Sequence, residues 1–239
     1  MKRVSYKAVL AEIVGTFALV LCGAGAVAAN ELTGGGVTVA GIALAHGLTI
    51  VAIGYALGYV SGAVINPAIT IGLLVARQMT LFQAIAYIVA QFFGGFLGAL
   101  VLSFAVANAQ PDAATRGDLT LGATVLMDGL TSTQGLVIEA VGTFFLAFTA
   151  LSMVADKRAQ QSFAPLAIGV ALAIFILWAG PLTGASANPA RTLGPALVRG
   201  KVEEAPTILV VYFIGPVVGA VLAGLAKAYL FTADSDART

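Results

Sequence analysis

Six blocks of apolar residues dominate this chain, and they are long enough to cross a lipid bilayer. An α-helix rises 1.5 Å per residue, so about 20 apolar residues cross the roughly 30 Å of bilayer hydrocarbon. The six blocks cover residues 9–29, 37–60, 82–106, 136–154, 163–179 and 208–231. Two further apolar stretches, 66–76 and 188–198, are too short to cross. The sequence therefore predicts an all-α membrane protein with six spans.

The composition agrees with a membrane protein and excludes several functions. Charged residues make up 10% of the 239 residues, the mean hydropathy is +0.99, and the formal net charge is only +1. Scattered basic residues and a net charge near zero argue against a nucleic-acid partner. The chain has one histidine, His46, and one cysteine, Cys22. These are too few for a metal site or an internal disulfide, so no metal or cofactor is expected, and an intramembrane enzyme is the least favoured function.

The first apolar block could be mistaken for a cleaved signal peptide. Lys2, Arg3 and Lys7 precede it, and residues 26–28 resemble a cleavage site. Against this interpretation, Glu12 interrupts the apolar run, and a copy of the same segment recurs in the middle of the chain. We therefore expect the block to remain as the first span.

Three segments of the sequence recur at nearly constant offsets. Residues 11–17 recur at 138–144, residues 61–68 recur at 183–190, and Gly94 with Gly98 recurs as Gly215 with Gly219. The paired glycines are typical of close helix crossings. The repeat predicts one channel domain made of two halves of three spans. These halves are about 1–107 and about 132–231, joined by a loop of about 108–133. Because each half has an odd number of spans, the second half must be inverted in the membrane.

The basic residues predict the orientation of the chain. A cytoplasmic N-terminus places eight Lys or Arg inside: Lys2, Arg3, Lys7, Arg77, Lys157, Arg158, Lys227 and Arg238. Only three then face outward: Arg116, Arg199 and Lys201. This distribution satisfies the positive-inside rule. We expect a multi-pass protein of the cell membrane with both termini in the cytoplasm. The connecting loop, which carries Asp112, Asp118 and Asp128, would lie outside.

Each short apolar stretch opens with an Asn-Pro-Ala motif: Asn66, Pro67 and Ala68 in the first, and Asn188, Pro189 and Ala190 in the second. Asn is a favourable helix N-cap, and Pro is tolerated at the first helical position. Ten residue steps separate the proline from Arg77 or Arg199, which corresponds to about 15 Å of helix. The motifs therefore predict two half-helices whose N-termini meet at the bilayer midplane. The positive ends of both helix dipoles would repel cations there.

Short runs of irregular backbone precede both motifs. Such backbone survives at membrane depth only beside protein or a water-filled cavity. We expect carbonyl groups to line a narrow polar path together with the two asparagine amides. These carbonyls belong to Gly62, Ala63, Val64, Gly184, Ala185 and Ser186. Glu12 and Glu139, at equivalent places in the repeat, are expected to accept backbone N–H groups and anchor these runs. The alternative role for the two acids is a proton relay, as in a transporter.

Together these residues resemble the aquaporin, or major intrinsic protein, family over nearly the whole chain. The resemblance is carried by Ala11-Glu12 with Gly15-Thr16, by Ser61 to Thr70, by Glu139, and by Thr183 to Ala196. It implies a right-handed bundle of six transmembrane helices with two re-entrant half-helices. It also implies a pore in every subunit and assembly as a homotetramer.

The resemblance also implies a four-residue selectivity filter: His46, Ile176, Ala185 and Arg191. This set looks most like the plant tonoplast-type branch. It departs from strict water channels, which carry Phe and His at the first two positions, and from glycerol facilitators, which carry Trp, Gly and Phe. Thr192 stands where glycerol facilitators usually carry Asp. Val64 replaces the loop histidine expected before the first motif, which argues against gating by that residue.

Two of the filter residues are notable on chemical grounds alone. An ionisable residue inside the membrane, such as Arg191, is a functional candidate by default. Its guanidinium can donate hydrogen bonds to water while its charge repels cations. We expect His46 to line the pore opposite Arg191.

The sequence therefore predicts a passive water channel in the lipid bilayer that excludes protons and ions. One alternative is a broader pore that also passes ammonia, urea or glycerol, because Ile176 and Ala185 restrict it less than His and Cys would. An ion-coupled secondary transporter is a more remote alternative, because inverted repeats and broken helices also occur in those folds.

Overall fold

A computed structural model describes residues 4–107, 109, 119–155, 160–200 and 204–230, and these residues form helices and loops without a strand. Six helical spans among them are long and apolar enough to cross a membrane. They are α1 (Tyr6–Leu19) continued by η1 (Val20–Ala24) and α2 (Gly25–Leu32); α3 (Thr38–Ser61); α5 (Leu81–Val106); α6 (Ser132–Ala155); η2 (Gln161–Phe163) continued by α7 (Ala164–Thr183); and α9 (Ala205–Thr207) continued by η4 (Ile208–Ile214) and α10 (Gly215–Leu230). The predicted all-α membrane fold is confirmed.

Several spans are longer than their apolar blocks. The first span runs from Tyr6 to Leu32 rather than over 9–29, because polar residues at both ends also join the helix. Helices α3 and α7 end in the same way, with the C-cap residues Gly62 and Gly184. These glycines have φ values of 89° and 78°, a left-handed conformation that glycine adopts without steric cost.

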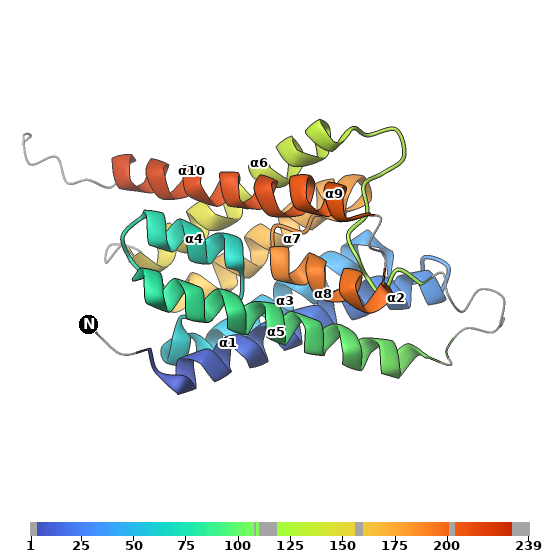
Figure 1. Cartoon of the computed structure of the whole chain (residues 1–239), viewed down its shortest axis with the longest axis horizontal. Coiled ribbons are helices and arrows are strands. Elements are labelled where there is room, and N and C mark those ends of the chain that lie inside the picture. The colour runs from blue at the N-terminus through green and yellow to red at the C-terminus, as the bar shows by residue number, and fades with distance from the viewer. Residues whose placement is uncertain (1–3, 108, 110–118, 156–159, 201–203, 231–239) are drawn as a thin grey trace, which may run out of the picture.

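The two predicted half-helices are α4 (Pro67–Val75) and α8 (Pro189–Arg199). Figure 1 shows them within the bundle, α4 toward one end and α8 toward the other. The expectation that the first continues to Arg77 is wrong. The helix ends at Val75 because Arg77 has φ 57°. The N–H groups of Arg77 and Gln78 then turn back to Leu74 and Leu73 in a Schellman-type cap.

Two segments of π-helix, η1 and η4, interrupt the first and last spans and were not predicted. A π-helix adds a residue to one turn. It leaves the apolar composition of a span unchanged, so hydropathy does not reveal it.

The paired glycines lie at helix crossings, as predicted. A Cβ at Gly94 would collide with the backbone carbonyl of Ile13, so the absence of a side chain at Gly94 allows α5 to pack closely on α1. A Cβ at Gly219 would collide with the carbonyl of Ala140 and thus brings α10 onto α6. The equivalent spans of the two halves are therefore packed through equivalent glycines.

Further glycines join the two halves to each other. Gly47 of α3 and Gly169 of α7 each face the other's carbonyl oxygen, and their positions differ by the 122-residue offset of the repeat. A Cβ at Gly95 of α5 would lie 2.7 Å from the carbonyl oxygen of Ala190 in α8, and a Cβ at Gly72 of α4 would lie 2.9 Å from that of Ala220 in α10. Each half-helix thus packs against the last span of the opposite half.

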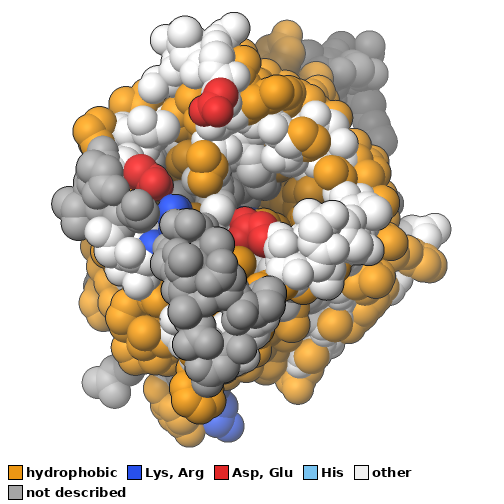
Figure 2. Space-filling model, turned by 90° about the vertical axis from the view of Figure 1, so that its right-hand side faces the viewer, with side chains coloured by type: hydrophobic (Ala, Val, Ile, Leu, Met, Phe, Trp, Pro, Cys, Tyr) orange, Lys and Arg blue, Asp and Glu red, His pale blue; other side chains and the backbone are white. Residues whose placement is uncertain are grey.

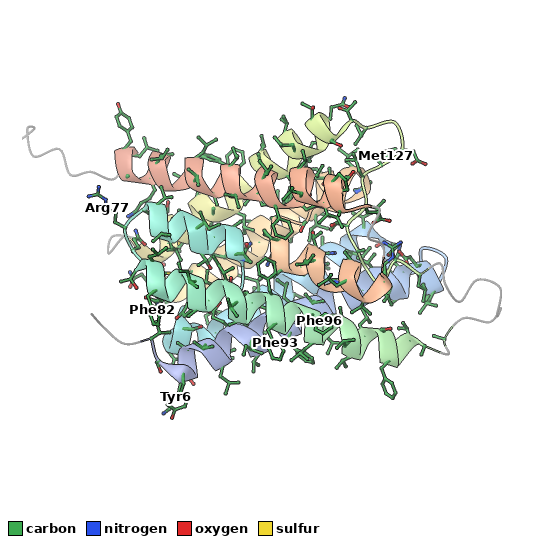
Figure 3. The ribbon with its side chains drawn as sticks, in the orientation of Figure 1. Tyr6, Arg77, Phe82, Phe93, Phe96 and Met127 are labelled. Carbon is green, nitrogen blue, oxygen red and sulfur yellow. The ribbon has the colours of Figure 1, made fainter. Side chains whose placement is uncertain are left out.

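The flanks of the bundle are apolar, as an integral membrane protein requires. Hydrophobic side chains cover the flanks in Figure 2, and acidic side chains gather on the end face. Figure 3 shows Tyr6, Arg77 and Phe82 near one end of the bundle and Met127 near the other. Large side chains remain exposed along the outside, for example Phe93 at 51% and Phe104 at 85%.

The orientation of the chain stays a prediction. Most of the charges that decide it lie outside the described residues: Lys2, Arg3, Arg116, Lys157, Arg158, Lys201 and Arg238, with Asp112 and Asp118 of the connecting loop. The division into halves at about 107 and 132 likewise stays a prediction.

Candidate functional site

The runs before the two Asn-Pro-Ala motifs have an unusual backbone. Ala63 and Ile65 have φ values of 46° and 42°, and their equivalents Ala185 and Ala187 have 43° and 51°. An L-residue in this left-handed region costs about 1–2 kcal/mol. Four such residues persist only because surrounding contacts fix them.

Glu12 fixes the first run. Its carboxylate is fully buried and accepts hydrogen bonds from the backbone N–H groups of Val64 at 3.0 Å and Ile65 at 2.7 Å. It also accepts from Ser61 Oγ at 2.6 Å and from Gln91 Nε2 at 2.7 Å. Both carboxylate oxygens therefore accept hydrogen bonds, from the re-entrant backbone and from two neighbouring side chains.

Glu139 does the same for the second run. It accepts from the N–H groups of Ser186 at 2.9 Å and Ala187 at 2.8 Å, and from Thr183 Oγ1 at 2.7 Å. All of these partners are buried. The geometry fits the expected role of both acids as loop anchors.

Sequence reasoning missed the tyrosines that complete this support. Tyr87 donates its hydroxyl to the carbonyl of Ser61 at 2.9 Å, and Tyr212 donates to the equivalent carbonyl of Thr183 at 2.8 Å. Their positions differ by 125 residues rather than by the 121 of the neighbouring glycines, so the repeat does not align them. The signal that could have found them is a tyrosine inside an apolar span, since a buried hydroxyl needs a partner.

The two asparagines bind each other's loops at the meeting point of the half-helices. Asn66 Nδ2 donates to the carbonyl of Ala187 at 2.8 Å, and Asn188 Nδ2 donates to the carbonyl of Ile65 at 2.9 Å. Each Oδ1 caps its own half-helix by accepting two backbone N–H groups. The capping predicted from the motif is therefore present at both ends. Pro67 and Pro189 begin the helices, and Ala68 and Ala190 are fully buried behind them.

A narrow cavity of about 30 Å³ lies beside the paired asparagines. A cavity of this volume has room for water. The wall combines polar groups with apolar side chains: Leu19, His46, Ile50, Val64, Asn66, Ile69, Leu146, Ile168, Leu172, Ser186, Asn188 and Arg191. Of the six residues whose carbonyls were expected to line the path, Val64 and Ser186 are in this wall.

Arg191 and His46 meet at the cavity. Arg191 Nη1 donates to the carbonyl of Gly122, and its Nη2 lies 3.3 Å from Nε2 of His46. His46 Nδ1 lies 2.9 Å from the carbonyl of Ile42, which can only accept, so Nδ1 carries the proton and Nε2 accepts from the arginine. Arg191 Nε is buried without a hydrogen-bond partner among the described residues.

The other two expected filter residues are placed differently. Ile176 and Ala185 are 2% and 1% exposed, and both belong to the main apolar core. Neither is in the wall of the 30 Å³ cavity. The structure therefore brings His46 and Arg191 together at the cavity, with Ile176 and Ala185 packed in the core.

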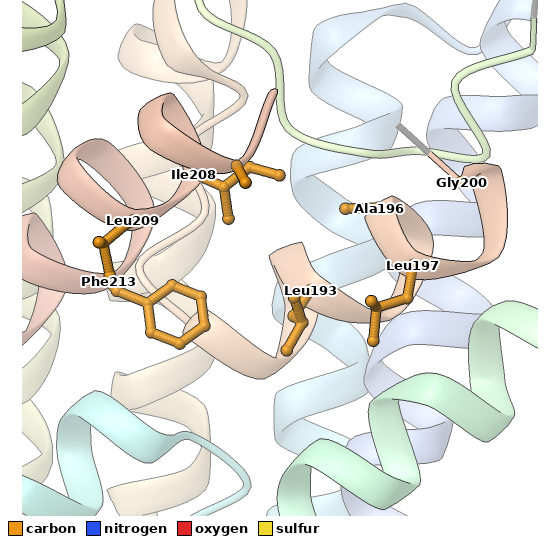
Figure 4. Close-up of a pocket in the computed structure, with 8 residues that line it drawn as sticks. Leu193, Ala196, Leu197, Gly200, Ile208, Leu209 and Phe213 are labelled. Atoms are coloured by element: carbon orange, nitrogen blue, oxygen red, sulfur yellow. The ribbon is translucent and has the colours of Figure 1, made fainter. Parts of the chain in front are cut away.

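Two larger cavities differ in character. One of about 260 Å³ is an apolar groove between α8 and the last span, and Figure 4 shows its lining, which includes Leu193, Leu197 and Phe213. The other, of about 310 Å³, lies between the end of α3 and the start of α7 and shares Ile50 and Ile168 with the narrow cavity. In the described part of the chain, no three His, Cys, Asp or Glu side chains are placed to hold a metal ion.

Comparisons with known proteins agree with this architecture. Residues 1–227 match the family described as "Major intrinsic protein". Aquaporin NIP3-1 of Arabidopsis thaliana is 38% identical over 211 residues, which are 88% of this chain and 63% of that protein. The chain thus spans somewhat less than two thirds of the length of this relative. Aquaporin TIP4-4 of Zea mays is 40% identical over 235 residues, which are 95% of this chain and 88% of that protein.

A solved structure has the same fold. The X-ray structure of the aquaglyceroporin from Plasmodium falciparum superposes with a TM-score of 0.79 and covers 92% of this chain and 94% of that chain, at 23% sequence identity. The inverted half-helices, their paired motifs and these relatives lead to one conclusion: the chain belongs to the major intrinsic protein family, the aquaporins.

Proposed function

We propose that this protein is a passive water channel that excludes protons and ions. The observation that carries the proposal is the cavity beside the N-termini of the two half-helices. Both motif asparagines, Ser186, His46 and Arg191 line it, and the rest of its wall is apolar. The polar groups in this wall give a water molecule hydrogen-bond partners that replace those it leaves in bulk water. The low polarity elsewhere keeps its binding weak enough for release.

The asparagine geometry supplies a reason for proton exclusion. A side-chain amide has two N–H donors, and each asparagine uses one of them on the opposite loop. The second donor of each is left for a passing water molecule. A water that accepts from both asparagines points its own hydrogens away from the centre, and this orientation interrupts a proton-conducting chain of waters.

Electrostatics act in the same direction. The N-termini of α4 and α8 carry partial positive charge because their first N–H groups lie outside the helical hydrogen-bond pattern. Arg191 adds a full charge beside the same cavity. Cations therefore meet a barrier at the centre of the path, whereas neutral molecules do not.

A broader pore for small neutral solutes is the second candidate. The observation that favours it is the apolar character of Ala185 and Ile176, which pack in the core and contribute no polar side chain to the wall of the narrow cavity. The tonoplast-type filter, with His46 and Arg191 completing the set, is part of this proposal. The named relatives are aquaporins, so they give no support to the alternative of an ion-coupled transporter.

We further propose a homotetramer in the cell membrane with both termini in the cytoplasm. Large exposed side chains on α3 and α7, among them Leu48 at 59% and Ile174 at 57%, offer an apolar surface for neighbouring subunits. Native mass measurement in mild detergent tests the tetramer. Accessibility of cysteines introduced near the termini tests the orientation.

Stopped-flow shrinkage of proteoliposomes tests the function. Under a sucrose gradient, wild type should shrink faster than protein-free vesicles. Glycerol, urea and ammonia gradients then measure the range of solutes. Arg191→Val should increase passage of the larger solutes without loss of folded protein. An unchanged ratio of glycerol to water permeability in this variant would exclude Arg191 from the filter.

A further inference from the structure

The position of the Arg191 guanidinium depends on a stretch of irregular backbone. Among the described residues it has two hydrogen-bond partners, the Gly122 carbonyl and His46. Gly122 lies in the coil that leads to α6, far from Arg191 in sequence. What holds Gly122 in place therefore also holds one side of the guanidinium.

Glu31, near the end of α2, holds this coil on its N-terminal side. Its carboxylate accepts from the backbone N–H of Thr120 at 3.0 Å and from the Thr120 hydroxyl. The same hydroxyl oxygen accepts from the N–H of Gly122 at 3.1 Å. Three successive hydrogen-bonded links therefore connect an exposed carboxylate to the buried arginine: Glu31 to Thr120, Thr120 to Gly122, and Gly122 to Arg191.

The first span also packs closely against Gly122. Gly122 has φ 69°, and a Cβ at this position would collide with the backbone and Cβ of Ala24. Ala24 and Glu31 are seven residues apart, about two helical turns, and so share one face of the span. Ala24 blocks movement of the Gly122 backbone toward the helix, and Glu31 prevents the coil from moving away.

The C-terminal side of the coil has anchors of its own. Thr124 Oγ1 lies 2.8 Å from Thr192 Oγ1, and the N–H of Met127 donates to the carbonyl of Leu182 at 2.8 Å. These bonds do not involve Glu31. Loss of Glu31 would therefore free the Gly122 side of the coil while the rest of it stays attached.

We propose that Glu31 is a positioning residue for the selectivity filter, which it serves through Thr120 and Gly122 without touching the permeating molecule. The inference rests on the proposed role of Arg191 in solute selection. When the anchor is lost, His46 is the one fixed partner that the guanidinium keeps among the described residues. The constriction is then less well defined, and larger neutral solutes pass more readily relative to water.

The test measures the ratio of glycerol to water permeability in proteoliposomes. Glu31→Ala and Thr120→Val should each raise this ratio about fivefold, the factor that corresponds to one net hydrogen bond. Glu31→Gln keeps one acceptor oxygen and should give a smaller rise. Asp128→Ala is the matched control: it removes an exposed acid from the coil itself, and it should leave the ratio at the wild-type value.

A second arm separates positioning from a general structural effect. In the Arg191→Val background, Glu31→Ala should cause no further change, because the group that it positions is gone. An unchanged or lower ratio in Glu31→Ala, or an equal rise in Asp128→Ala, would overturn the inference. If Arg191→Val itself leaves the ratio unchanged, the filter assignment fails instead, so the two failures can be told apart.

Discussion

Replacement of Glu139 tests whether its carboxylate anchors the re-entrant backbone before Asn188. Its carboxylate accepts three buried donors, the N–H groups of Ser186 and Ala187 and the hydroxyl of Thr183. In Glu139→Ala these donors lose their partner, at a cost of about 1–3 kcal/mol each and about 3–9 kcal/mol together. Since whole domains are stable by only about 5–15 kcal/mol, Glu139→Ala should yield little folded protein.

Glu139→Gln gives a graded version of the same perturbation. If its oxygen takes the place of Oε1, it keeps the bonds to Thr183 and Ser186, and only the N–H of Ala187 is left facing an amide N–H₂ group. One lost bond of about 1–3 kcal/mol corresponds to a Tm roughly 2–12 °C lower. Because the carbonyl of Ala187 accepts from Asn66, which lies in the wall of the narrow cavity, water permeability should also fall.

Thermal unfolding in detergent and osmotic shrinkage of proteoliposomes measure the two effects. Glu204→Gln is the control, because Glu204 lies at the end of the bundle in an ion pair of 3.6 Å with Arg199, and partly exposed pairs contribute less than about 1 kcal/mol. If Glu139→Ala were as stable and as permeable as wild type, the anchoring argument would be refuted.

Three further predictions concern packing and the pore. Gly94→Ala should lower Tm, because the new Cβ would collide with backbone atoms at a helix crossing. Gly58→Ala is the control: a Cβ there has no atom within 4 Å, so Tm should stay unchanged or rise. Thermal unfolding of both variants measures the difference. Gly23→Ala should slow osmotic shrinkage without preventing folding, because the new Cβ would lie 2.5 Å from the ring of His46 and push it into the pore. Asn188→Asp keeps the helix cap but replaces the amide donors with a negative charge, so proton leak measured with a trapped pH dye should rise; no change in leak would count against the asparagine mechanism.

The features that the sequence could predict are those with a local or repeated signal. An asparagine followed by proline specifies the start of a helix within a few residues, so the half-helices could be located from Asn66 and Asn188 alone. The glycine crossings at Gly94 and Gly219 could be located because the two halves repeat them. The buried acids could be assigned as anchors because unpaired backbone groups in a membrane need acceptors.

The features that could not be predicted depend on contacts between distant and irregular segments. The carbonyl of Gly122 reaches Arg191 across 69 positions from a coil that has no periodic pattern. The hydroxyls of Thr124 and Thr192 meet across 68 positions for the same reason. The end of α4 was misplaced because a left-handed Arg77 is not recognisable from residue type, since such a conformation favours glycine.

Contacts between distant segments also explain how the two irregular backbone runs before the Asn-Pro-Ala motifs are held in place inside a membrane. Backbone in the left-handed region at Ala63, Ile65, Ala185 and Ala187 is costly. Each run is fixed from one side by a buried glutamate and from the other by an asparagine of the opposite half. The two loops therefore stabilise each other.

Simultaneous measurement of osmotic water flow and proton leak in the same proteoliposomes tests the central claim most directly. A passive path between the two half-helices predicts shrinkage that speeds up with the amount of protein and has a low activation energy. It also predicts a proton leak no greater than that of protein-free vesicles. Water flow at the rate of empty vesicles, or a proton leak that grows with the amount of protein, would contradict it.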